Sequence, residues 1–134
     1  MNVKNIESTQ PTFGTRVRMD AHTARILSLS KPRNKVLKDI KILENNGVDD
    51  VLNLSAIYRD GEFHIKTSLF KELGSKYYYV SIKEEMEPIV QKAENGKNKY
   101  INLKKMYQEA AETLKYYQIF IGKKKFEKFL PYVV

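Results

Sequence analysis

The residues of this chain that could do chemistry are few and lie far apart in the sequence. The 134 residues include two histidines, His22 and His64, and no cysteine. Without cysteine, disulfides, thiolate metal sites and cysteine nucleophiles are excluded. The sequence also has no H-E-x-x-H motif, no phosphate-binding glycine loop and no nucleophile elbow. It therefore indicates no cofactor and no catalytic site, and a small enzyme with a site assembled from distant residues is the least favoured function.

Two pairs of residues resemble ligand or acid–base sites but are better explained by local structure. Asp20 and His22 could offer two metal ligands, yet no further ligand follows at a metal-binding spacing. Asp20 is instead placed to cap a helix, because its carboxylate can accept hydrogen bonds from the first backbone N–H groups. Asp49 and Asp50 precede a predicted strand, where neighbouring carboxylates are typical of a solvated turn. The sequence therefore predicts no metal site.

A set of basic and aromatic residues favours nucleic-acid binding on one face of a predicted sheet. If that face is open, Tyr77 and Tyr79 lie there with His64, Lys66 and Lys83. Aromatic rings interleaved with cations can stack unpaired bases while the cations hold phosphates. The alternative, which we favour, is that helices cover the tyrosines, because such rings are usually half-buried.

A second basic surface is predicted on a helix that spans about residues 31–45. Its outer face carries four lysines, and two arginines lie nearby in sequence. Such a face can contact phosphates without reading bases, although a solvated face is the more usual explanation. Together the two surfaces give the candidate nucleic-acid-binding residues Lys31, Lys35, Lys38, Lys41, Arg16, Arg18, Lys66, Tyr77, Tyr79 and Lys83.

Composition and charge limit the class of protein. Hydrophobic residues are 42% of the chain and charged residues 30%, which is an ordinary globular balance. The formal net charge of +8 favours polyanions or acidic partners. No apolar run approaches the roughly 20 residues that span a bilayer, and the first residues have no apolar signal-peptide core. We therefore expect a cytoplasmic protein without a transmembrane segment.

Residues 51–83 organise the predicted fold, because turn chemistry fixes the strand pairing there. Asp60-Gly61 separates two alternating runs and supplies the positive φ angles of a two-residue type I′ turn. The predicted pairs are Arg59 with Glu62, Tyr58 with Phe63, Ala56 with Ile65 and Leu54 with Thr67. A helical turn is expected over 69–73. The strand at 77–83 then turns Tyr78 and Val80 toward the same core as Leu52 and Leu54.

The flanking segments complete the predicted architecture. Alternation over 13–19 indicates an edge strand with a basic face, and helices are expected over 20–29 and 31–45. In the second of these helices, Val36, Leu37, Ile40 and Leu43 form the predicted apolar stripe, and Asp39 lies on the outer face. A short helix is predicted over 88–94. The longest helix is expected over 103–118.

The predicted fold class is α+β, with one domain over residues 12–134 after a mobile tail at 1–11. An antiparallel sheet of three to four strands, formed by the 51–83 meander and the N-terminal edge strand, has helices on at least one face. The predicted function is that of a small, soluble, basic binding module that acts through a protein partner. Nucleic-acid binding is the alternative. Oligomeric state does not follow from the sequence.

Overall fold

The computed structural model describes residues 14–74, 76–81, 86–92, 94–116 and 119–124. Their elements are, in order, β1 (Arg16–Met19), α2 (Ala21–Leu29), α3 (Arg33–Glu44), β2 (Asp50–Arg59), β3 (Glu62–Leu73), β4 (Tyr77–Val80), β5 (Met86–Pro88), β6 (Val90–Lys92), β7 (Asn98–Tyr100), α4 (Leu103–Tyr116) and β8 (Ile119–Gly122). The predicted tail at 1–11 lies outside the described residues, and so does Lys83.

The sheet is open and mostly antiparallel. Its strands follow the order β1-β2-β3-β4-β8, and β5 pairs with β3 beside this path. β1 is the predicted edge strand, but it runs parallel to β2, because α2 and α3 form a crossover that returns the chain to the same end of the sheet. A separate pair joins β6 to β7. The α+β class is confirmed, and the described sheet has six strands instead of three to four.

The hairpin of β2 and β3 has the predicted register. Asp60 and Gly61 have φ angles of 53° and 82°, so both central residues of the turn are left-handed, as a type I′ turn requires. The pairs Arg59–Glu62, Tyr58–Phe63, Ala56–Ile65 and Leu54–Thr67 all form. The pairing continues to Asp50 and Lys71, because β3 runs on through the segment where a helical turn was expected.

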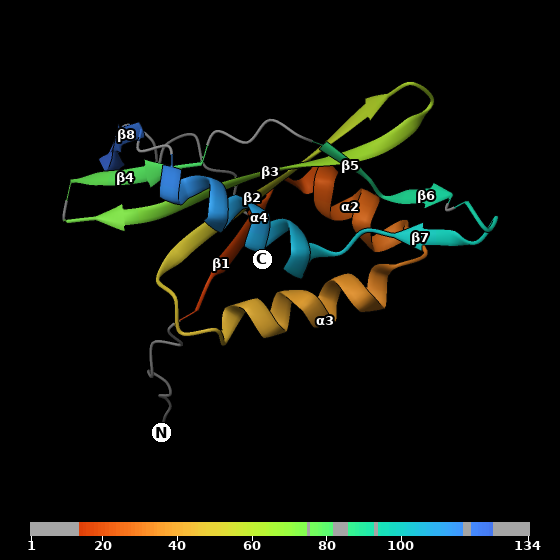
Figure 1. Cartoon of the computed structure of the whole chain (residues 1–134), viewed down its shortest axis with the longest axis horizontal. Coiled ribbons are helices and arrows are strands. Elements are labelled where there is room, and N and C mark those ends of the chain that lie inside the picture. Colours follow the sequence, from red (N-terminus) through yellow and green to blue (C-terminus); the bar gives the residue numbers. More distant parts are fainter. Residues whose placement is uncertain (1–13, 75, 82–85, 93, 117–118, 125–134) are drawn as a thin grey trace.

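The main core lies between the three described helices and one face of the sheet (Figure 1). Leu52, Leu54, Ile65 and Leu69 point from β2 and β3 toward the helices. The helices contribute Leu27, Val36, Leu43, Leu103, Met106, Ala110 and Leu114 to this cluster. Such residues recur at helical spacing, so each helix buries one stripe against the sheet. Within the described residues, no helix is long and apolar enough to cross a membrane.

The length of β3 corrects the predicted orientation of β4. Lys71 pairs with Tyr79 and Phe70 pairs with Val80. Paired residues point to the same face, so Tyr79 lies on the helix-covered face with Lys71, and Val80 lies on the opposite face. Tyr78 and Val80 are buried there in a second cluster with Val51 and Phe70. The prediction placed a helical turn at 69–73, which would have ended β3 before this pairing. Because β3 continues to Leu73, its pairing with β4 determines the faces of Tyr78 and Val80, and the predicted orientation was wrong.

Two helix predictions also need correction. The described residues of 88–94 form no helix, because β5 pairs with β3 and β6 pairs with β7. In α3 the buried stripe is rotated: Leu37 is 54% exposed, whereas Asp39 is 3% exposed. The rotation follows from packing, because α3 contacts both β1 and α4 and turns the side between them inward. The spacing of apolar residues predicts that α3 has one apolar side. It does not show which residues of that side face β1 and α4 and which stay exposed.

Candidate protein-binding groove

The predicted constellation of aromatic and basic residues on one sheet face does not form. Tyr79 packs against the main core on the helix-covered face, and its ring centroid lies 5.3 Å from that of Phe120. Tyr77 has the same orientation, because it lies two residues away in the same strand. His64 and Lys66 belong to the opposite face, where they pair with Ile57 and Ser55. The sheet itself therefore separates the tyrosines from His64 and Lys66.

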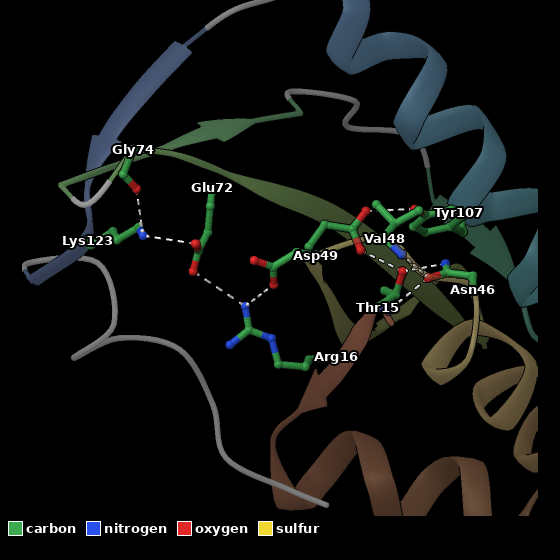
Figure 2. Close-up of polar contacts among 10 residues, drawn as sticks. Thr15, Arg16, Asn46, Val48, Asp49, Glu72, Gly74, Tyr107 and Lys123 are labelled. Carbon is green, nitrogen blue, oxygen red and sulfur yellow. Dashed lines mark hydrogen bonds and ion pairs between the residues drawn. The ribbon is translucent and has the colours of Figure 1, made fainter. Parts of the chain in front are cut away.

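Three of the predicted basic residues do share a face. Arg16 and Arg18 pair with Val51 and Asn53, which places them on the same face as Lys66. The Arg16 guanidinium lies 3.4 Å from the Asp49 carboxylate and 3.9 Å from that of Glu72 (Figure 2). These ion pairs compensate much of its charge. Whether these residues bind nucleic acid remains a prediction.

The lysines of α3 divide into two groups. Lys35 forms an ion pair with the buried carboxylate of Asp39, at a distance of 3.5 Å. The charge of Lys35 is therefore compensated within the protein. Lys38 and Lys41 lie on another side of the helix, and they make no ion pair with any residue that the structure describes. Lys31 precedes the helix and borders a different part of the surface. Only part of the predicted lysine face therefore offers uncompensated charge.

Lys38 and Lys41 line a groove of about 720 Å³ between α2 and α3, beside the end of β1. The floor is apolar, because Met19, Leu27 and Val36 belong to the buried core. The full lining is Met19, Ala24, Leu27, Ser28, Arg33, Asn34, Val36, Leu37, Lys38, Ile40, Lys41 and Glu44. We call this the α2–α3 groove.

Residue size and helical spacing explain why the groove exists. Ala24 and Ser28 lie one turn apart on the side of α2 that lines it, and their small side chains leave space between the helices. On α3, Leu37, Ile40 and Lys41 are spaced by three and four residues, so they lie along one side of the helix. The start of α2 is fixed by Asp20, whose carboxylate accepts a 2.7 Å hydrogen bond from the backbone N–H of Thr23.

The rim of the groove combines positive charge with an exposed apolar side chain. The lining includes three cationic side chains, those of Arg33, Lys38 and Lys41, and one carboxylate, that of Glu44. Leu37 is 54% exposed at this rim, although an isolated leucine gains about 1.5–3 kcal/mol from full burial. Ile42, on the same helix, is 45% exposed but does not line the groove. The arrangement can bind an apolar side chain and attract a nearby negative charge.

A second polar feature, the buried network around Asp50, was not predicted. The Asp50 carboxylate accepts hydrogen bonds from the hydroxyl groups of Thr15, at 2.6 Å, and Tyr107, at 2.7 Å. The Thr15 hydroxyl in turn accepts a 2.7 Å hydrogen bond from the side-chain amide of Asn46. Asp50 is 2% exposed and Thr15 is fully buried. The prediction of a solvated turn is therefore wrong for Asp50, although Asp49 is exposed.

Burial controls the ionisation of this network. Desolvation raises the pKa of Asp50 above its ordinary value of 3.8, although the hydrogen bonds from Thr15 and Tyr107 and the charge of Lys71 act in the opposite direction. Desolvation also raises the pKa of Tyr107 to about 12. Because Asp50 is 2% exposed, its carboxylate is closed off from a substrate in solution in this conformation. Its hydrogen bonds connect the residue before β1, the start of β2 and α4.

The backbone around the network is equally close-packed. The N–H of Thr15 donates to the carbonyl of Leu43 at 3.0 Å and to the side-chain oxygen of Asn46 at 3.1 Å. A Cβ atom at Gly14 would lie 1.8 Å from the carbonyl oxygen of Glu44, so only glycine fits there. The start of β1 is therefore fixed against the end of α3, which forms one wall of the α2–α3 groove.

The two histidines lie in different surroundings. His22 is exposed, and its ring lies edge-on to Phe63 with a centroid distance of 6.5 Å. His64 has its Nε2 3.4 Å from a carboxylate oxygen of Glu62, and its Nδ1 is buried without a hydrogen-bond partner. Within the described residues, no three His, Asp or Glu side chains come close enough to hold a metal ion.

Sequence reasoning missed Leu37 as a surface residue and Asp50 as a buried one. A signal for the groove was present in Ala24 and Ser28, two small residues one turn apart on a helix that precedes another helix. No local signal marks Asp50, because its partners lie 35 and 57 residues away. Comparisons of the chain with protein-family models, with curated proteins and with solved structures give no match.

Proposed function

We propose that this protein is a binding module for a protein partner and that the α2–α3 groove is its binding site. The occupant is an amphipathic helix of the partner that carries apolar side chains on one face and acidic residues beside them. The observation that supports this proposal most strongly is the combination of an apolar floor with three uncompensated cations, Arg33, Lys38 and Lys41.

Size and shape favour a helix as the occupant. A volume of about 720 Å³ accommodates several side chains, and it lies in the range of ordinary ligand sites. The groove is open along two helices, so a third helix can lie in it and insert side chains at i, i+4 and i+7. Leu37 at the rim would lose its exposure to water in such a complex. Burial of Leu37 therefore contributes to affinity.

Charge favours an acidic partner. The rim carries three cations and one carboxylate, and the whole chain has a formal net charge of +8. Complementary charges increase the rate of association and suppress partners of the wrong sign. A basic partner helix would be repelled, even if its apolar face fitted the groove. Acidic residues beside the apolar stripe are therefore part of the proposed specificity.

The test compares two leucine-rich peptides of about four helical turns, one with glutamate and one with lysine at the polar positions. We expect only the glutamate peptide to bind in isothermal titration calorimetry. Leu37→Ala should weaken binding by about tenfold, as expected for a buried apolar anchor. Ile42→Ala is the matched control and should leave the affinity unchanged, because Ile42 is similarly exposed but lies outside the groove.

Three results would contradict the proposal: equal binding of both peptides, binding of neither, or equal effects of the two substitutions. Nucleic-acid binding is separated by the same variants. A duplex oligonucleotide bound by Lys38 and Lys41 would show a steep loss of affinity with salt and no sensitivity to Leu37→Ala, because phosphate contacts do not use the leucine. That result, without peptide binding, would favour the nucleic-acid alternative.

A further inference from the structure

A second groove lies on the other side of α2, at the end of the molecule that carries β5, β6 and β7 (Figure 1). Its volume is about 790 Å³. Ile26 and Leu29 from α2, Phe63 from β3, and Ile89 and Val90 near β6 form its apolar lining. We call it the α2–β6 groove. It shares no lining residue with the α2–α3 groove.

The apolar surface of the α2–β6 groove extends beyond its walls. Leu29 is 77% exposed and Val90 is 37% exposed. Beside the groove, Tyr58 is 63% exposed and packs edge-on against Phe63, with ring centroids 4.9 Å apart. Exposed apolar patches that continue over several elements are typical of protein contacts. This patch combines a hollow, lined by Phe63 and Ile89, with a projecting side chain, Leu29.

The charges at the rim identify the occupant. Lys31 and Glu62 border the groove with opposite signs. Lys31 is exposed and makes no ion pair with any residue that the structure describes. The Glu62 side chain is 52% exposed, and a carboxylate oxygen lies 3.4 Å from Nε2 of His64. One cation and one anion on the same rim are complementary to a second copy of the same rim, turned by a two-fold axis.

We propose that the α2–β6 groove binds a second copy of this chain and forms a two-fold symmetric dimer. In an isologous interface each contact occurs twice, so Lys31 of each copy faces Glu62 of the other. Leu29 of each copy enters the groove of the other and covers Phe63. The proposal does not depend on the α2–α3 groove, because the two surfaces share no lining residue.

The test measures the dissociation constant by sedimentation velocity over a series of protein concentrations. At physiological ionic strength the repulsion between two chains of net charge +8 is screened beyond about 8 Å. We expect the average mass to rise from 15.7 kDa toward twice that value. Leu29→Ser should raise the dissociation constant about tenfold or more. Leu37→Ser, the control at the exposed leucine of the other groove, should leave the constant unchanged.

Charge reversal tests the two-fold arrangement. Lys31→Glu and Glu62→Lys should each weaken the dimer, and the double variant should restore it, because both ion pairs then re-form with reversed polarity. A mass that stays at 15.7 kDa at every concentration would overturn the proposal. So would a dimer that responds to Leu37→Ser but not to Leu29→Ser, or a double variant that is no tighter than the single variants. Thermal unfolding of each variant shows that it is folded.

Discussion

Two polar regions of the sheet begin at neighbouring residues and differ in almost every other respect (Figure 2). Asp50 points to the helix-covered face, where its carboxylate is bonded by Thr15 and Tyr107 and is 2% exposed. Asp49 points to the other face, where its side chain is 60% exposed and pairs with Arg16. Successive residues along a strand point to opposite faces of the sheet. Two neighbouring carboxylates can therefore differ completely in their exposure to solvent.

The second region continues as a chain of ion pairs along the surface. Arg16 also approaches Glu72, and Lys123 lies 3.3 Å from Glu72 and 3.0 Å from the carbonyl oxygen of Gly74. Both regions hold several polar contacts, but they differ in how far those contacts are buried. Water can replace the contacts of Arg16, whose side chain is 45% exposed, whereas a buried group that loses its partner stays unsatisfied. In both regions the polar groups form hydrogen bonds or ion pairs with other residues of the protein, whereas Lys38 and Lys41 in the α2–α3 groove form no ion pair with any described residue.

The largest effect should come from removing the buried carboxylate. Asp50→Ala leaves the hydroxyl donors of Thr15 and Tyr107 without their acceptor, which should lower the free energy of unfolding by about 2–4 kcal/mol. Urea unfolding measures this change as a shift of the midpoint. Asp50→Asn is the matched control, because it keeps an acceptor oxygen and removes the charge. We expect its cost to be smaller, and equal costs would contradict the account.

The pH dependence of the buried region gives a signed prediction. Burial raises the pKa of Asp50 above 3.8, so the folded protein holds this proton more tightly than the unfolded chain does. The resulting stability is fully present below about pH 3.8 and is lost as the pH rises through the raised pKa. The parent should therefore lose stability relative to Asp50→Asn across this window. A relative gain would show that the pKa of Asp50 is lowered.

The smallest effect should come from the exposed region. Arg16→Gln removes ion pairs to Asp49 and Glu72, but the Arg16 side chain is 45% exposed and water replaces the contacts. The free energy of unfolding should change by about 0.5 kcal/mol or less. The same urea experiment checks this value. A decrease in the free energy of unfolding as large as that of Asp50→Ala would contradict the proposed difference between the two regions.

The sequence was sufficient where structure is determined locally. Asp60-Gly61 predicts the hairpin register because the turn residues themselves require positive φ angles. Asp20 predicts the start of α2 because a helix cap depends on neighbours three residues away. The predicted helix at 103–118 corresponds to α4, whose described part is Leu103–Tyr116. In each case the deciding contacts lie within a few residues of one another.

The sequence was insufficient where contacts between distant elements decide. Asp50 is buried because Tyr107, 57 residues later, covers it. The face of Tyr79 depends on where β3 ends, and a pattern of alternating residues does not mark that end. Leu37 is exposed because α3 shares its inward side between β1 and α4. The α2–α3 groove depends on the separation of two helices, which no single stretch of sequence specifies.

The central claim is that the α2–α3 groove, and not a face of the sheet, receives the partner. The most direct measurement is a titration of the labelled protein with the glutamate peptide, followed by NMR chemical shifts of the backbone amides. We predict that the largest changes occur at Ala24, Ser28, Leu37 and Ile40, which line the groove. Arg18 and Lys66 on the opposite face of the sheet should not change. Changes centred on Arg18 and Lys66, with Leu37 unaffected, would contradict the account.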